Sequence, residues 1–296
     1  DMLEKEKGIV NSEINMITSD PVNIGLNKML KNLYNIKTTS VDLIGGTTDN
    51  INHLTREDVV NYFNQNYYPA NMTTVITGDV KPEEAIELVS KYFTSDKLPP
   101  KDRHFEDLKP IDKPVREDII SDKAKGTTIL VGFNGPESNN IEDKVKILAL
   151  DMILANLSSS RLETKLKDYN TSLFIEDEKI SSKTGAPRAM IIGGQTTEEN
   201  SEKVLKVLYQ EIENIKVNPP TDEELGIAKK QLSKLFSSVF ETSAGTNGII
   251  GEVLLDSSFD EITKFKEIAD GLTSKDIADT AKKYYDLNKA SITVVH

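Results

Sequence analysis

The first helical pattern of the chain, at residues 2–17, places two carboxylates among apolar side chains. At about 100° per residue, Glu6 lies at the centre of an apolar arc made of Met2, Leu3, Ile9, Val10, Ile14, Met16 and Ile17. Glu13 lies about 20° from Glu6, inside the same arc. An amphipathic helix normally turns its carboxylates toward water, because burying an unpaired carboxylate is costly. The pattern therefore predicts that both carboxylates point inward.

The residues alone leave three explanations open for this pair. A neighbouring element could supply an Arg or Lys to each carboxylate, or the helix register could differ from the one assumed. Alternatively, one carboxylate could be a metal ligand and the other its supporting partner, since a cation can hold carboxylates within an apolar face.

A second pattern occurs twice in the chain. Residues 54–78 read LTREDVVNYFNQNYYPANMTTVITG, and residues 272–295 read LTSKDIADTAKKYYDLNKASITVV. Each begins with a capping box, contains a Tyr-Tyr pair and ends in a Thr/Val/Ile run typical of a strand. A capped helix followed by a strand is common, so chance is one reading. The shared order favours the other reading, which is two related domains offset by 218 residues, as Leu54 and Leu272 are.

The repeat and the linker composition divide the chain. Residues 95–114 are rich in Pro, Lys and Asp and show no apolar periodicity, as expected of a linker. We therefore expect residues 1–94 to be the C-terminal part of a first domain and residues 115–296 to be a complete second domain. The first domain would then begin roughly 90 residues before Asp1.

The second domain mixes strands and helices without strict alternation. Strand patterns occur at 126–136 and 189–196. Helix patterns occur at 140–157, at 197–215, after the capping box Thr221-x-x-Glu224, and near 259–270. This order predicts an α+β fold with helices on one face of a sheet.

Composition excludes several classes of function. The net charge of −12 argues against nucleic acid and anionic membranes as partners. The absence of cysteine excludes disulfides and Cys-ligated metals. No apolar run approaches transmembrane length and no signal peptide opens the chain, so we expect a cytoplasmic location.

No complete catalytic constellation is present in the sequence. The histidines His53, His104 and His296 are not spaced as metal ligands, either with each other or with a Glu. Phosphate-binding loops and nucleophile elbows are also missing. The paired carboxylates Glu6 and Glu13 are therefore the main candidates for chemistry.

Several segments resemble a known family of peptidases. EKEKGIVNSEINM, with IGGTTDNINHLTREDVVNYFNQNYYPANMTTVITGDVKPEEAIELVSKYF, is similar to the end of the first domain of pitrilysin-type zinc metallopeptidases. These enzymes are the inverzincins, with the signature His-x-x-Glu-His. The likeness continues through SSSRLETKLKDYNTSLF and TDEELGIAKKQL to the last strand. It implies two related domains of the pitrilysin/mitochondrial-processing-peptidase-like metallohydrolase fold, with helices on a mainly antiparallel sheet and the first domain truncated.

The resemblance implies roles for four residues. Glu13 falls on the third zinc ligand, and Glu6 on an essential acidic companion seven positions earlier. Lys167 and Phe174 stand where a substrate-binding Arg and an intermediate-stabilising Tyr occur in the family. Lysine lacks the planar guanidinium, and phenylalanine has no hydroxyl to donate. Nearby Arg161 and Tyr169 are either substitutes for that pair or helix-surface contacts.

The His-x-x-Glu-His segment itself is absent from the chain. The resemblance therefore implies zinc in the intact protein, no zinc bound by these residues alone, and no activity of this chain alone. It further implies peptides or unfolded segments as substrates and a homo- or heterodimer with another pitrilysin-like subunit. The alternative is a non-catalytic subunit with a structural or substrate-holding role. Without the zinc helix, we expect the first turns of helix 2–17 to be poorly anchored or rearranged.

Overall fold

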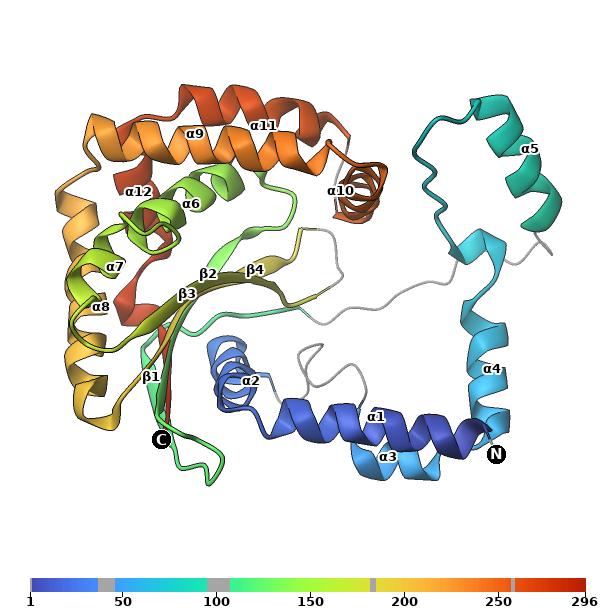
Figure 1. The fold of residues 1–296 in the computed structure, drawn as a ribbon, viewed down its shortest axis with the longest axis horizontal. Helices are drawn as coiled ribbons and strands as arrows, with labels where there is room; N and C mark the ends of the chain where they lie inside the picture. The colour runs from blue at the N-terminus through green and yellow to red at the C-terminus, as the bar shows by residue number, and fades with distance from the viewer. Residues whose placement is uncertain (1, 37–45, 95–106, 182–184, 257–258) are drawn as a thin grey trace.

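The computed structural model describes residues 2–36, 46–94, 107–181, 185–256 and 259–296 (Figure 1). They contain a five-stranded sheet with the order β1-β5-β2-β4-β3. Its strands are β1 (Val115–Ile119), β2 (Thr127–Glu137), β3 (Ser172–Lys179), β4 (Pro187–Thr196) and β5 (Ser291–Val295). The β1–β5 pair is parallel and the other three pairs are antiparallel. The fold is α+β with a mainly antiparallel sheet, which confirms the predicted class.

A thick layer of helices lies on one side of this sheet (Figure 1). It contains α6 (Ile141–Leu154), α7 (Arg161–Leu166), α8 (Ser201–Val217), α9 (Asp222–Val239), α11 (Asp260–Gly271) and α12 (Ser274–Tyr284), with short 3₁₀ turns η2 (Glu198–Asn200) and η3 (Leu287–Lys289). Alternate residues of β2, namely Ile129, Val131 and Phe133, belong to the core on this side. This core holds most of the buried apolar side chains.

The opposite face of the sheet is covered by α2 (Pro21–Tyr34), a helix from outside residues 115–296, for which the sequence predicted helices on one face. Met29, Leu30 and Leu33 of α2 are fully buried in a second cluster together with Leu130 of β2. Gly25 permits the close approach, since a Cβ there would lie 2.7 Å from Leu130 Cδ1. Sequence patterns could not show this packing, because α2 precedes the sheet by some eighty residues of intervening sequence.

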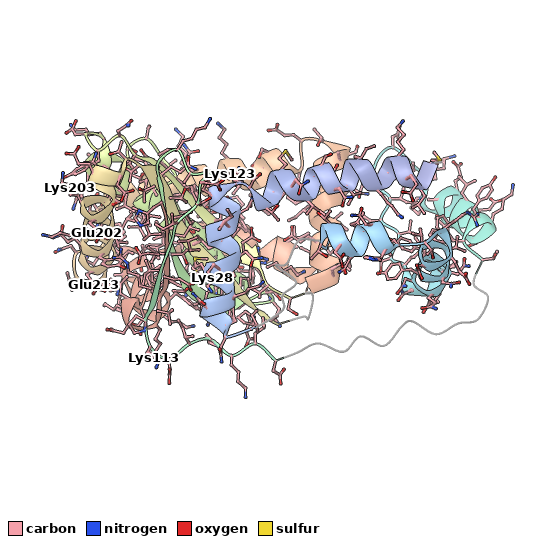
Figure 2. All side chains as sticks on the ribbon, turned by 90° about the horizontal axis from the view of Figure 1, so that it is seen from below. Lys28, Lys113, Lys123, Glu202, Lys203 and Glu213 are labelled. Atoms are coloured by element: carbon pink, nitrogen blue, oxygen red, sulfur yellow. The ribbon has the colours of Figure 1, made fainter. Side chains whose placement is uncertain are left out.

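The remaining N-terminal helices stand away from the sheet (Figures 1 and 2). They are α1 (Met2–Thr18), α3 (Thr48–His53), α4 (Arg56–Asn66) and α5 (Pro82–Tyr92), with a 3₁₀ turn η1 (Pro69–Asn71). In Figure 2, α2 with its labelled Lys28 lies along the sheet while α1 extends away from it. None of the described helices has the length and apolar character needed to span a bilayer.

The internal repeat is visible as a repeated order of elements. Helices α1 to α4, turn η1 and residues 72–77 follow one another as do α9, α10 (Ser243–Asp256), α11, α12, η3 and β5. The predicted capping boxes of α4, α9 and α12 are all formed. One expectation is wrong, because residues 72–77 are not in a sheet. A strand needs a partner, and none of the described strands pairs with them.

Burial differs sharply between the two copies of the repeat. Ile277 and Ala281 of α12 are completely buried, whereas their counterparts Val59 and Phe63 of α4 are 45% and 56% exposed. The contrast extends over the whole first copy. Large apolar side chains exposed in residues 54–78 are Leu54, Val59, Val60, Tyr62, Phe63, Tyr67, Met72 and Ile76, and those exposed in the residues that follow are Val80, Ile86, Leu88, Tyr92 and Phe93.

Candidate functional site

Glu6 and Glu13 lie on α1 and face away from the described protein interior. Both are exposed, and neither forms an ion pair or side-chain hydrogen bond with any described residue. On the same helix Met2 and Met16 are 80% and 67% exposed. The side of the apolar arc that holds Met2, Ile9 and Met16 is therefore open to solvent, whereas Ile14 on its other side is buried. The ion-pair explanation has no support among these residues.

The first turns of α1 are regular helix, so of the two expected outcomes, poor anchoring or rearrangement, the structure shows no rearrangement. Ile14 is the one residue of α1 that is buried. Polar contacts with α3 add to this anchor, as Lys7 Nζ donates to the Asn52 carbonyl at 3.1 Å and Asn11 Nδ2 donates to Asn52 Oδ1 at 2.8 Å. Local hydrogen bonds and these few contacts suffice to keep the helix formed, although little apolar surface is buried.

The described residues do not supply a zinc site on their own. No group of three His, Cys, Asp or Glu side chains among them is placed to share a metal ion. Zinc needs at least three protein ligands, and Glu13 offers a single carboxylate. Its role as a ligand therefore stays a prediction that requires groups from outside this chain.

Lys167 and Phe174 are held by different elements. Lys167 is exposed at the end of α7. Phe174, on β3, is half-buried and packs over Gly193 of β4, where a Cβ would lie 2.2 Å from Phe174 Cζ. Figure 1 places α7, which ends beside Lys167, within the helix layer, and α1, which carries Glu13, beyond α2 on the other side of the sheet.

Arg161 is engaged in a structural ion-pair network. Its Nε lies 2.6 Å from Glu224 Oε1, and its Nη1 lies 3.5 Å from Glu211 Oε1. Hydrogen bonding by Arg161 lowers the pKa of Glu224 to about 2. Glu211 is completely buried and is also paired with Lys165. These contacts join α7, α8 and α9, which is the helix-surface role rather than a substrate-binding one.

Tyr169 likewise has a structural place. Its ring is partly buried against the main core, and its carbonyl accepts hydrogen bonds from Thr196 Oγ1 at 3.1 Å and Asn200 Nδ2 at 3.0 Å. Of the two possible substitutes for the family's Arg/Tyr pair, Arg161 is therefore engaged through its guanidinium, and Tyr169 is held through its ring and its backbone carbonyl.

Sequence reasoning missed a buried pair of polar side chains, formed by Asp151 of α6 and Tyr285 directly after α12. The Tyr285 hydroxyl donates to Asp151, and both side chains lie inside the core. Burial raises the pKa of Asp151 to about 7 and raises the pKa of Tyr285 well above its usual value. Tyr284 and Lys283 bond Asp143 on the same helix, at 2.5 and 2.7 Å. The Tyr-Tyr pair of the repeat was the available signal.

This combination of fold and repeat defines a class of protein. The described α+β domain and the helices that precede it align over almost their whole length with solved structures of peptidases. A peptidase M16 inactive domain from Pseudomonas fluorescens aligns with a TM-score of 0.84 and 18% identity over 100% of this chain and 70% of that one. A protease from Helicobacter pylori aligns with a TM-score of 0.83 and 18% identity over 99% of this chain and 72% of that one.

The chain belongs to the peptidase M16 family. Residues 53–232 match the family model described as the peptidase M16 inactive domain. A curated relative, the uncharacterized zinc protease YmfH of Bacillus subtilis, is 36% identical over 87 residues, which cover 29% of this chain and 20% of YmfH. The matched stretch is thus a small part of that protein.

Proposed function

We propose that residues 1–296 are part of a zinc-dependent metalloendopeptidase that hydrolyses peptides or unfolded polypeptide segments, and that they are inactive alone. Residues 1–94 would be the C-terminal part of the zinc-site domain, 95–114 a linker and 115–296 a non-catalytic domain. The family match and the zinc protease relative support the general class. We further propose a cytoplasmic location and a dimer with the same or another M16-type subunit.

The observation that carries this proposal is the correspondence between α1 and α9. In α9, Leu225, Ala228 and Leu232 are buried, and the helix contacts α6. The residues 218 positions earlier are Lys7, Val10 and Ile14 of α1, so two of the three counterparts are apolar. By the same repeat, this face of α1 would meet the first-domain counterpart of α6, which in the family carries His-x-x-Glu-His.

Both candidate carboxylates border that face. Glu6 corresponds to Glu224, and Glu13 corresponds to Gln231. Neither Glu224 nor Gln231 is fully exposed in the completed domain. We therefore assign Glu13 as one zinc ligand and Glu6 as its acidic companion, with the other ligands supplied by residues outside these 296. Lys167 and Phe174 would occupy the degenerate Arg/Tyr positions near the substrate.

The test is the zinc content of the intact protein. Glu13→Gln should abolish zinc retention measured by metal analysis after gel filtration, because the neutral amide is a poor zinc ligand. Glu4→Gln is the matched control, since Glu4 lies on the same helix but pairs with Lys7 at 2.9 Å. Zinc content that is unchanged in Glu13→Gln would refute the ligand assignment.

A second candidate function is a non-catalytic, substrate-holding subunit of a heterodimer. The observation that favours it is Phe174, whose ring packs on Gly193 and offers no hydroxyl. Purified intact protein that contains no zinc and no peptidase activity, yet forms a complex with an active M16-type subunit, would support this alternative over the first.

A further inference from the structure

An apolar cavity of about 270 Å³ lies between α10 and the helix layer, beside the ends of α9 and α11 (Figure 1). Val145 and Leu148 of α6 line it together with Ile262 of α11, and Ile249 and Val253 line it from α10. An engineered cavity of about 150 Å³ lined by Leu, Ile and Phe stays dry and binds benzene. The cavity beside α10 therefore has room for one large apolar side chain.

Three phenylalanines line this cavity, and they pack on one another. Phe236 stacks on Phe265 with the ring centroids 5.0 Å apart, and it meets Phe240 edge-on, also at 5.0 Å. Phe240 is 37% exposed, so its ring is not fully covered by the described residues. Aromatic rings prefer these stacked and edge-on arrangements, and a further ring can join the row in the same way. The lining therefore favours an aromatic ligand.

Two side chains of opposite charge also line the cavity, namely Lys144 and Glu252. Lys144 Nζ donates to the Ser138 carbonyl at 3.1 Å, and an ammonium group has two further N–H donors. Glu252 is exposed and supplies acceptors. A peptide backbone offers both acceptors and donors, whereas a fatty acid would meet Glu252 and a net charge of −12. The charges therefore suit a peptide better than an anionic lipid.

The cavity is only loosely enclosed by α10. None of the described residues of α10 is buried, and Phe236 and Phe265 across the cavity are only partly buried. Another side of α10 contacts the preceding part of the chain, since Asn247 Nδ2 donates to the Val75 carbonyl at 2.9 Å. Ligand sites occur preferentially where two parts of a protein meet. A ligand in this cavity would cover apolar surface that is now partly exposed, which is favourable.

We propose that this cavity binds one aromatic side chain of an extended peptide. The described residues that line it belong to α6, α9, α10 and α11 or directly follow α9, so the site is separate from Glu6 and Glu13 on α1. Unfolded segments display aromatic side chains that folded proteins mostly bury, so such a site would select them. The inference rests on the proposed function for the peptide nature of the ligand, but it does not require zinc.

The chain contains no tryptophan, so a tryptophan in a peptide can be followed by its own fluorescence. The probe is an unstructured Gly/Ser peptide with one central Trp, and the same peptide with Ala is compared by competition. With chain 1–296, the Trp emission should shift to shorter wavelength, because the indole leaves water. The Trp peptide should bind at least about tenfold more tightly than the Ala peptide. Equal binding of the two peptides would overturn the proposal.

Val253→Phe tests the cavity itself, because the larger side chain fills it, and it should remove the preference for the Trp peptide. Leu254→Phe is the matched control, since Leu254 is 47% exposed and does not line the cavity. It should leave the preference unchanged. Phe240→Ala removes part of the aromatic lining and should weaken the preference, which covers the case that Val253→Phe does not fold. An unchanged preference in either cavity variant, with native circular dichroism, would overturn the proposal.

The preference should also hold in the intact protein, measured there by the fluorescence anisotropy of the two peptides carrying fluorescein. Equal binding of the two peptides by the intact protein would overturn the proposal, whatever its zinc content. An intact protein that holds no zinc but keeps the preference would support the peptide site and refute the zinc proposal. The failure of one proposal is thus distinguishable from the failure of the other.

Discussion

At the scale of single residues, Asp151 is the most unusual group in the described structure. It is buried in the core beside Tyr285, and the charge of Asp177 adds to the burial in raising its pKa to about 7. The hydrogen bond from Tyr285 opposes this shift without cancelling it. A carboxyl group that gives up its proton near neutral pH inside a core couples the stability of the domain to pH.

We predict that the Asp151 carboxyl makes the domain less stable as pH rises. The unfolded pKa is about 3.9, so the folded state holds the proton more tightly. The stabilisation is complete below about pH 4 and is lost as pH approaches and passes 7. Urea unfolding measures the free energy of unfolding at pH 5 and at pH 8. Between these two pH values it should fall less for Asp151→Asn than for the unsubstituted chain. An equal fall in both proteins would show that the Asp151 carboxyl does not cause the pH dependence.

At the scale of elements, matched capping boxes separate helices that are packed from helices that are not. Thr273 caps α12 and Thr55 caps α4 with the same geometry, each accepting from an aspartate N–H three residues on. The helix that follows Thr273 is anchored in the core, whereas the one that follows Thr55 exposes its apolar side chains. Identical local chemistry therefore has different consequences for global stability.

We predict that Thr273→Ala lowers the free energy of unfolding by about 1 kcal/mol, the usual value of an N-cap. Thr55→Ala should leave the main urea transition unchanged and instead increase hydrogen exchange within α4, since that helix opens without unfolding the core. Circular dichroism measures the urea transition of both variants, and hydrogen exchange measures the opening of α4. Equal shifts of the main transition would show that α4 unfolds together with the second domain.

Apolar runs and helical periodicity sufficed for the elements that build the main core. Residues 126–136, 140–157 and 189–196 were predicted as elements and correspond to β2, α6 and β4. Helix α10 gave no such signal, because small, polar and apolar residues are mixed along it and Glu252 and Asp256 are its only charged residues. Strand β3 was not predicted, because three consecutive acidic residues, Glu176, Asp177 and Glu178, interrupt its strand pattern.

The candidate site was less predictable than the fold. Helical periodicity placed Glu6 and Glu13 within an apolar arc. The helix that we propose this arc faces is not among the described residues. The Asp151–Tyr285 pair could not be predicted either, because it joins two helices 134 residues apart. Contacts of that kind depend on tertiary packing rather than on local pattern.

At the scale of the whole molecule, α2 joins an early segment of the sequence to the core around the sheet. Leu30 is 1% exposed and packs with Leu130 and Tyr34 on the sheet face opposite the helix layer. Residues 21–34 precede the sheet by some eighty residues, yet their apolar side chains are buried against it. Packing therefore crosses the domain boundary that sequence composition predicts.

We predict that Leu30→Ala lowers the free energy of unfolding of the second domain by about 3 kcal/mol, the usual cost of a buried Leu→Ala change. Met16→Ala is the control, since Met16 is 67% exposed on the adjoining helix and should change stability little. Urea unfolding followed by circular dichroism measures both. A second-domain transition that is unaffected by Leu30→Ala would show that α2 contributes no stability there.

The short join between α1 and α2 has a mechanical consequence. Only Ser19 and Asp20 separate the two helices, and α2 is packed on the sheet. One end of α1 is therefore tied to that sheet, with Glu13 about 8 Å and Glu6 about 18 Å from the join. A rotation of about 10° about the join would displace them by about 1 Å and 3 Å. If the two carboxylates serve zinc as we propose, their alignment depends on how α2 packs against a sheet that they do not touch.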